Sequence, residues 1–210
     1  LGRYSFLAAD PFLYLEQPAD DTDSLGRLAR AMACCPATTV EGVPPFQGGA
    51  AGLLGYELGR QLEVLPRPAA DEFGMPALAL GFYDVVFAWD HLDGRAWVVS
   101  QGLPELEPDR RRRRAEQRLR EALAWLDVAP ATFDALAAGP SRRGDVAIGA
   151  LVRQYPMPGV EGLTSNFSRD GYLGAAARAV QYIHAGDIFQ VNLSQRLLCP
   201  ARDDSAALYL

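Results

Sequence analysis

Four polar side chains recur at every second position near the carboxyl end of the chain: Gln190, Asn192, Ser194 and Arg196. Successive side chains of a strand point to opposite faces, so this spacing would place two amides, a hydroxyl and a guanidinium on one face. Such groups are costly to bury without hydrogen-bond partners. The pattern suggests a partly buried polar network, although an amphipathic strand with one solvated face is the simpler interpretation.

The other residues that could carry chemistry form no recognisable catalytic or metal-binding pattern. His91 and His184 are the only histidines, and neither has the spacing of a metal ligand pair or a catalytic triad. A glycine-rich stretch at 48–55 lacks the lysine and hydroxyl residue of a phosphate-binding loop. All 20 lysine-plus-arginine residues are arginine, so this span offers no lysine nucleophile. From residue chemistry alone, we predict no catalytic residue and no metal ligand here.

A helix leads into the polar segment and is the best-marked element of the sequence. Ser168 is a suitable N-cap, and Asp170 favours the first turn, where it meets unpaired amides and the helix dipole. Apolar residues then recur at helical spacing as far as Ile183. Gly186 ends the helix, because glycine adopts the left-handed conformation without strain. We predict a helix over 168–185 and a strand from Ile188 to Leu197.

Further elements are predicted upstream. Residues 3–9 form a short β-like run, 24–33 a short helix capped by Ser24, and 78–100 two strand runs joined by a turn at Asp93-Gly94. Pro108 suits the first turn of a helix that carries five consecutive arginines, 110–114. Interleaved acidic residues favour a solvated helix face with ion pairs over a polyanion-binding patch.

Composition limits the class of protein. The 210 residues are 49% hydrophobic and 22% charged, as in an ordinary globular protein. A net charge of −6 argues against nucleic acid as a partner. No apolar run approaches the roughly 20 residues needed to span a bilayer, so we expect no membrane partner and a cytoplasmic location. Three cysteines, two of them adjacent, form no disulfide framework.

Two long segments resemble a known family. Residues 45–60 (PFQGGAAGLLGYELGR) and 186–196 (GDIFQVNLSQR) are similar to the component I subunits of aminodeoxychorismate synthase and anthranilate synthase, which are chorismate-utilising enzymes. Shorter matches at 3–6, 10–11, 81–84 and 165–168 occur in the same order, so the resemblance covers nearly the whole chain. Glycine before Arg60 looks more like the aminodeoxychorismate branch.

The resemblance implies an α+β fold, with mixed and antiparallel sheets in a sandwich and helices outside. It implies an amino-terminal region over 1–127 and the start of the chorismate-binding catalytic region over 166–210. Between them, residues 128–165 are rich in glycine, proline and serine, a composition that predicts a linker or surface crossing. The implied activity is amination of chorismate to 4-amino-4-deoxychorismate for p-aminobenzoate and folate, with ammonia from a separate or fused glutamine amidotransferase. Anthranilate synthase is the first alternative, and a non-catalytic homologue or aromatic amino acid-binding module the second.

The site residues of the family are expected mostly outside this span. The chain begins without methionine and stops at Leu210 inside a helix-like segment, so we expect an amino-terminal fragment that is inactive alone. The lysine of the covalent intermediate, the glutamates that bind Mg2+ and the substrate-binding residues are expected beyond Leu210. A tryptophan pocket, regulatory in the anthranilate branch, would match Leu1, Gly2, Arg3 and Tyr4 here, although an ordinary edge strand explains the last two equally well.

Overall fold

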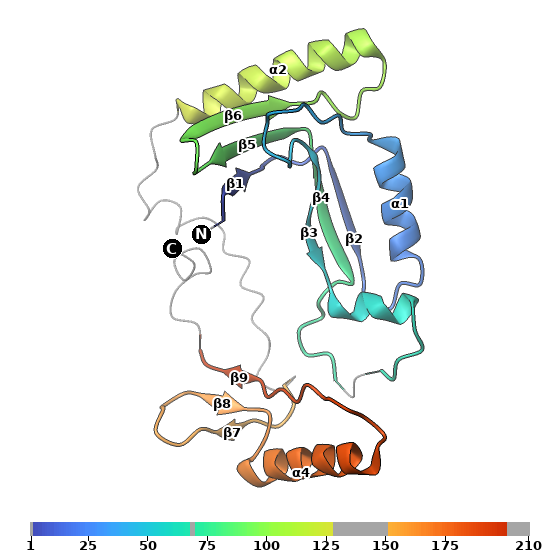
Figure 1. The fold of residues 1–210 in the computed structure, drawn as a ribbon, viewed down its shortest axis with the longest axis vertical. Helices are drawn as coiled ribbons and strands as arrows, with labels where there is room; N and C mark the ends of the chain where they lie inside the picture. The colour runs from blue at the N-terminus through green and yellow to red at the C-terminus, as the bar shows by residue number, and fades with distance from the viewer. Residues whose placement is uncertain (1, 68–69, 128–150, 201–210) are drawn as a thin grey trace. The chain divides into compact units, whose positions relative to one another are not determined.

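The computed structural model describes residues 2–67, 70–127 and 151–200, which fall into two compact units, Leu1–Pro130 and Ala131–Leu210 (Figure 1). The first unit holds, in chain order, β1 (Tyr4–Leu7), β2 (Leu13–Gln17), α1 (Ser24–Cys34), β3 (Gly49–Leu54), the 3-10 helix η1 (Tyr56–Gln61), β4 (Leu78–Tyr83), β5 (Val85–Asp90), β6 (Arg95–Ser100) and α2 (Pro108–Leu126). The second holds β7 (Tyr155–Pro156), β8 (Thr164–Ser165), α4 (Arg169–Ala185) and β9 (Leu197–Leu198).

The first sheet of unit 1 has the strand order β1-β5-β6, and both pairings are antiparallel. Its β5-β6 hairpin closes at the predicted Asp93-Gly94 turn, where Gly94 has a φ of 63°. Helix α2 packs on one face of this sheet, so that Val85, Phe87 and Ala122 form a buried cluster flanked by Trp89 and Val98. The hairpin prediction is therefore confirmed.

The second sheet of unit 1 has the order β2-β4-β3, again antiparallel. Three alternate residues of β4, Leu78, Leu80 and Phe82, form its buried core, and α1 covers them with Leu28 and Ala31. Only Asp84 separates β4 from β5, so the chain passes from one sheet to the other at a single residue. The apolar run at 78–90 thus serves two sheets rather than one.

The glycine-rich stretch forms β3. It contains glycines because parts of it approach neighbouring backbone too closely for a side chain or adopt a positive φ. Gly48 and Gly49 have φ values of 142° and 124°, which favour glycine. At Gly52 a Cβ would overlap the carbonyl oxygen of Ala79 on β4. These contacts support a structural role for the glycines.

Helix α2 begins as the sequence predicts. Pro108 is its first residue, and the side chain of Glu107 accepts hydrogen bonds from the amides of Asp109 and Arg110. These backbone bonds lower the pKa of Glu107. Helix α1 differs slightly, because Asp23 occupies its N-cap position and Ser24 is its first helical residue. The Ser24 hydroxyl instead donates to Oδ2 of Asp21, at 2.8 Å.

Unit 2 consists of a small antiparallel sheet, in the order β7-β8-β9, and helix α4. Both predicted helix ends are confirmed: Oγ of Ser168 accepts from the amide of Gly171, and Gly186 closes the helix with a φ of 81°. The sequence predicts a linker over 128–165. Residues 128–150 lie outside the described residues, whereas 151–165 contain β7 and β8 and belong to unit 2.

The prediction of a strand from Ile188 to Leu197 is wrong. In this part of the chain the only strand is β9, which consists of Leu197 and Leu198. Their partner is β8, which is two residues long and ends at Ser165. Alternation of side chains describes an extended backbone, but a strand also needs a neighbour for its amides and carbonyls. The fold class is confirmed: the chain is α+β, with antiparallel sheets and helices packed against them.

Candidate functional site

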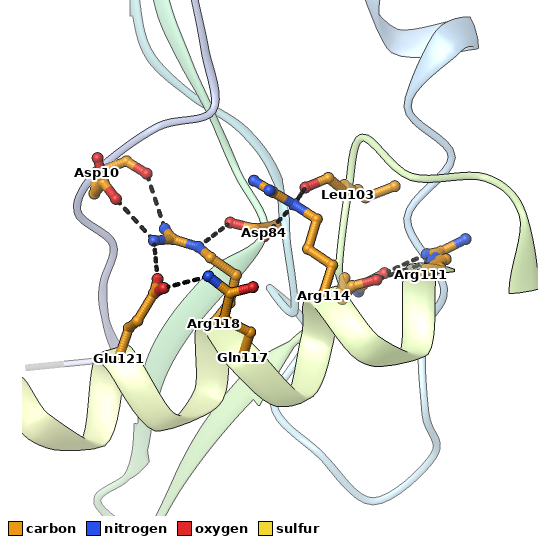
Figure 2. A network of polar contacts seen from close by, with 9 residues as sticks. Asp10, Asp84, Leu103, Arg111, Arg114, Gln117, Arg118 and Glu121 are labelled. Atoms are coloured by element: carbon orange, nitrogen blue, oxygen red, sulfur yellow. Dashed lines mark hydrogen bonds and ion pairs between the residues drawn. The ribbon is translucent and has the colours of Figure 1, made fainter. Parts of the chain in front are cut away.

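The arginine run of α2 divides between two faces of the helix. Arg110, Arg112 and Arg113 are exposed, whereas Arg111, Arg114 and Arg118 follow one another at spacings of three and four residues and bond inward (Figure 2). The solvated, ion-paired face that the sequence favours is therefore only part of this helix. Its other arginines tie α2 to the two sheets of unit 1.

Arg118 binds two carboxylates that are distant in sequence. Its Nε lies 3.3 Å from Oδ1 of Asp84, and its Nη1 lies 2.8 Å from Oδ2 of Asp10. The same Nη1 donates to Glu121 one turn along the helix, at 2.9 Å. Arg118 is 8% exposed, and Asp84 is completely buried. Asp10 and Asp84 each connect a strand of one sheet to a strand of the other, so Arg118 fastens both crossings.

Burial dominates the electrostatics of Asp84. Loss of solvent raises the pKa of this carboxyl, and the opposing effects of Arg118 and Arg114 are smaller. Oδ2 accepts no hydrogen bond from a described residue, and its ion-pair partner is Nε of Arg114 at 3.7 Å. Arg114 directs that Nε to the carbonyl of Leu103, at 2.8 Å. Because Asp84 has no exposed surface, a substrate cannot reach it, and its role is to position the chain.

A second set of bonds continues from Arg111. Its Nε donates to the carbonyl of Gln101 at 2.8 Å, directly after β6. The side-chain amide nitrogen of Gln101, Nε2, donates to the backbone carbonyls of Thr38 and Gln47, at 2.6 and 2.9 Å. Gln47, itself buried, exchanges hydrogen bonds with the backbone of Val40, at 2.8 and 2.9 Å. We call the linked residues the seam: Asp10, Gln47, Asp84, Gln101, Arg111, Arg114 and Arg118.

Of the residues expected to form a tryptophan pocket, Arg3 precedes β1 and Tyr4 is its first residue, and the pocket itself stays a prediction. Leu1 is outside the described residues, and Gly2 is exposed. Arg3 donates from Nε to both carboxylate oxygens of Asp90, at 3.1 and 3.0 Å, and its guanidinium stacks over the Tyr4 ring at 5.0 Å. The bonds from Arg3, together with the amides of Leu92 and Asp93, lower the pKa of Asp90 to about 2. Arg3 thus closes the hairpin end in this structure.

The four polar residues of the carboxyl-terminal segment are not gathered into one network within the described part of the chain. Gln190, Asn192 and Ser194 are exposed, and Arg196 is half-buried. The segment is anchored by its backbone at one end, where the amide of Arg196 donates to Oδ1 of Asn166 at 2.8 Å. Their membership of a larger buried network stays a prediction.

A cavity of about 880 Å³ lies beside η1, at the end of the 45–60 stretch that carries the family resemblance. Its lining includes Arg60, Gln61 and Leu62, together with residues from the loop before α1. Arg60 pairs with Glu57 and donates from Nη1 to the carbonyls of Leu65 and Pro66, at 2.9 and 2.8 Å. The second conspicuous motif of the sequence therefore shapes a concave surface.

Comparison with known proteins decides the family. The chorismate binding enzyme family matches residues 7–210. The chain belongs to the chorismate-binding enzyme family. Anthranilate synthase component 1 of Thermus thermophilus is 36% identical over 80% of this chain and 30% of its own length. Aminodeoxychorismate synthase component 1 of Salmonella typhimurium is 32% identical over 93% of this chain and 38% of its own length.

Solved structures agree on the fold of this family member. Anthranilate synthase component I from Streptococcus pneumoniae superposes with a TM-score of 0.70 at 19% identity, covering 99% of this chain and 44% of that protein. This likeness supports the fold alone. The chain thus spans 30% to 44% of the length of these three relatives.

In the ranges 2–67, 70–127 and 151–200, no group of three or more His, Cys, Asp or Glu is placed to hold a metal ion. No helix among the same residues is both long and apolar enough to cross a membrane.

Sequence reasoning missed the seam, although two signals could have shown it. Arg111, Arg114 and Arg118 share a helix face with the buried Ala122, and Asp84 interrupts an apolar run. A charged residue at a buried position is costly unless paired, so each signal calls for the other. The pairing itself spans 34 residues and depends on the tertiary fold.

Proposed function

We propose that the protein carrying this chain is the large subunit of an aminodeoxychorismate synthase. It would replace the C4 hydroxyl of chorismate with an amino group, using ammonia from a glutamine amidotransferase and releasing water. Membership of the chorismate-binding family supports the substrate, and aminodeoxychorismate synthases are among the relatives. The choice of branch rests on one observation, the glycine that precedes Arg60.

That glycine is not demanded by local packing. A Cβ at Gly59 would meet only the Cδ1 methyl of Leu65, at 3.8 Å, which is ordinary van der Waals contact. The backbone there also lacks the positive φ that favours glycine. A bulkier residue, as in the anthranilate branch, would therefore be tolerated by the neighbours that the structure describes. Gly59 therefore indicates the branch of the family, and we assign it no function in the site.

The contribution of this chain to the reaction would be structural. The resemblance assigns ring attack at C2 to a lysine, and this sequence has no lysine. It likewise assigns Mg2+ to glutamates, and the described residues form no matching cluster. The role left to this chain is to hold its own sheets in place, and within unit 1 the seam supplies part of that rigidity.

Product analysis tests the proposal directly. The purified protein is incubated with chorismate, Mg2+ and ammonium chloride, and the products are separated by chromatography. Formation of 4-amino-4-deoxychorismate, which a lyase converts to p-aminobenzoate, would support the assignment. Release of pyruvate with anthranilate would instead identify the second candidate, anthranilate synthase. No turnover of chorismate by a folded protein would contradict both.

The second candidate has its own support, because anthranilate synthases are found at comparable identity. The Thermus thermophilus protein is 36% identical over 80% of this chain and 30% of its own length. A tryptophan site at Gly2, Arg3 and Tyr4 would accompany that activity. Calorimetric titration with L-tryptophan, repeated on the Tyr4→Ala variant, tests this site: saturable heat that the variant loses would support it, and no heat would contradict it.

A further inference from the structure

Large apolar side chains beside η1 are exposed to solvent. Val64 is fully exposed and Leu62 is 74% exposed. Leu65 and Met75 line the same cavity, at 39% and 54% exposure. Scattered exposed hydrophobic residues are normal, but a contiguous group around a concavity marks an interaction surface. We call Leu62, Val64, Leu65, Met75 and the acidic residues around them the η1 surface.

The η1 surface is held in place by partly buried and exposed hydrogen bonds rather than by a core. Gln61 accepts from the amide of Leu25 at 3.1 Å and donates to the carbonyl of Asp21 at 2.8 Å, which ties η1 to the start of α1. Arg60 fixes the other side through the carbonyls of Leu65 and Pro66. A surface ordered before binding loses less conformational entropy when a partner docks.

Charge indicates what kind of partner fits. Asp20, Glu63 and Asp71 line the cavity, and none of them forms an ion pair with a described residue. Arg67 is the only lining guanidinium that is likewise unpaired in the described ranges, because Arg60 is paired with Glu57. The unpaired charges among the lining residues therefore sum to a net negative value beside the exposed apolar side chains. Such a surface complements apolar side chains flanked by lysine or arginine.

We propose that the η1 surface is the docking site for a basic, apolar segment of the glutamine amidotransferase that delivers ammonia. This inference rests on the proposed function, which requires such a partner. The exposed apolar side chains would supply the buried contact, and the acidic residues would steer the approach. Apart from Asp20, both features lie in the segment 45–75, which contains the motif that first indicated the family.

Two leucines allow a matched test in the whole protein. Leu62 and Leu92 have the same exposed fraction, 74%, but Leu92 lies in the β5-β6 turn, away from η1. With Leu62→Asp, affinity for the amidotransferase and the glutamine-dependent rate should each fall about tenfold or more, because a carboxylate would be buried in an apolar contact. The ammonia-dependent rate should stay unchanged. Leu92→Asp should alter none of these quantities.

A second pair of variants tests the acidic residues. Glu63→Lys should slow association with the amidotransferase and weaken its dependence on ionic strength, whereas Glu41→Lys, an exposed site outside the cavity, should not. Unchanged binding in both Leu62→Asp and Glu63→Lys would overturn the proposal. So would loss of ammonia-dependent activity and thermal stability in Leu62→Asp, since the rest of the protein would then cover this surface. If the unsubstituted protein does not aminate chorismate, the proposed function fails, while the affinity measurements still decide the docking site.

Discussion

Arg118 and Asp84 form a buried ion pair, with Nε of the guanidinium 3.3 Å from Oδ1 of the carboxylate and neither residue more than 8% exposed. The pair joins α2 to the single residue between β4 and β5. A buried pair of this kind is not by itself strong evidence of added stability, because removing two charges from water is expensive. Each charge of the pair requires the other, because removing one partner leaves the other charge buried and uncompensated.

Breaking the pair from one side should destabilise unit 1. Asp84→Ala leaves Arg118 buried with less compensation, and we expect a loss of about 3–5 kcal/mol in the free energy of unfolding. The double variant Asp84→Leu, Arg118→Met should recover much of this loss, since it leaves no unpaired charge. Urea unfolding followed by circular dichroism measures both, with Arg112→Met on the exposed face as the control. A purely additive double variant would contradict the coupling.

Acid should act on the fold through Asp90. Its pKa is lowered to about 2 from an ordinary 3.8 by the bonds from Arg3 and from the turn amides. A carboxyl with a depressed pKa stabilises the folded state above its unfolded pKa, and that contribution disappears as the pH falls toward 2. The stability difference between the wild type and Asp90→Asn should therefore shrink between about pH 4 and pH 2. A difference that stays constant over this range would contradict the assignment.

Asp84 should show the opposite pH dependence. Burial raises its pKa, so the folded state binds the proton more tightly than the unfolded chain does. Its contribution is then present below the ordinary value of 3.8 and decreases as the pH rises. In Asp84→Asn this decline should be absent. Thermal unfolding at a series of pH values, with Asp90→Asn as the comparison, separates the two carboxyls by the sign of their slopes.

Gly52 should tolerate no side chain. A Cβ there would overlap the carbonyl oxygen of Ala79, so Gly52→Ala must push β3 away from β4 at a loss of about 1–3 kcal/mol. Gly174, within α4, is a suitable control because a Cβ at that position would meet nothing within 4 Å. Gly174→Ala should be neutral or stabilise by up to about 1 kcal/mol through helix propensity. Equal unfolding midpoints for the two variants would rule out the close contact.

The end of α4 offers a backbone test. Gly186 has a φ of 81°, in the left-handed region that strains residues with a Cβ. Gly186→Ala should cost about 1 kcal/mol, and Gly186→Asn less, because asparagine tolerates this region better. Hydrogen exchange of the last-turn amides would report the difference. Equal protection in all three proteins would show that the cap does not depend on glycine.

Local structure and family could be predicted from the sequence. Ser168 and Gly186 mark the ends of α4, Pro108 marks the start of α2, and Asp93-Gly94 marks the hairpin turn. Each of these signals acts through backbone atoms a few residues away, so no distant partner is needed to interpret it. The long motifs at 45–60 and 186–196 identified the family for a similar reason, since they are contiguous.

Long-range pairing was decided only by the tertiary structure. Asp84 pairs with Arg118, and the side chain of Gln101 donates to the carbonyl of Thr38, 63 residues away. Both contacts form because the tertiary fold of unit 1 brings these segments together. The alternation at 188–196 shows the converse, since it predicts a strand that no neighbouring strand in the described residues completes. Composition can state that a charge or an amide needs a partner. Which partner it obtains depends on chain crossings that bring distant segments into contact.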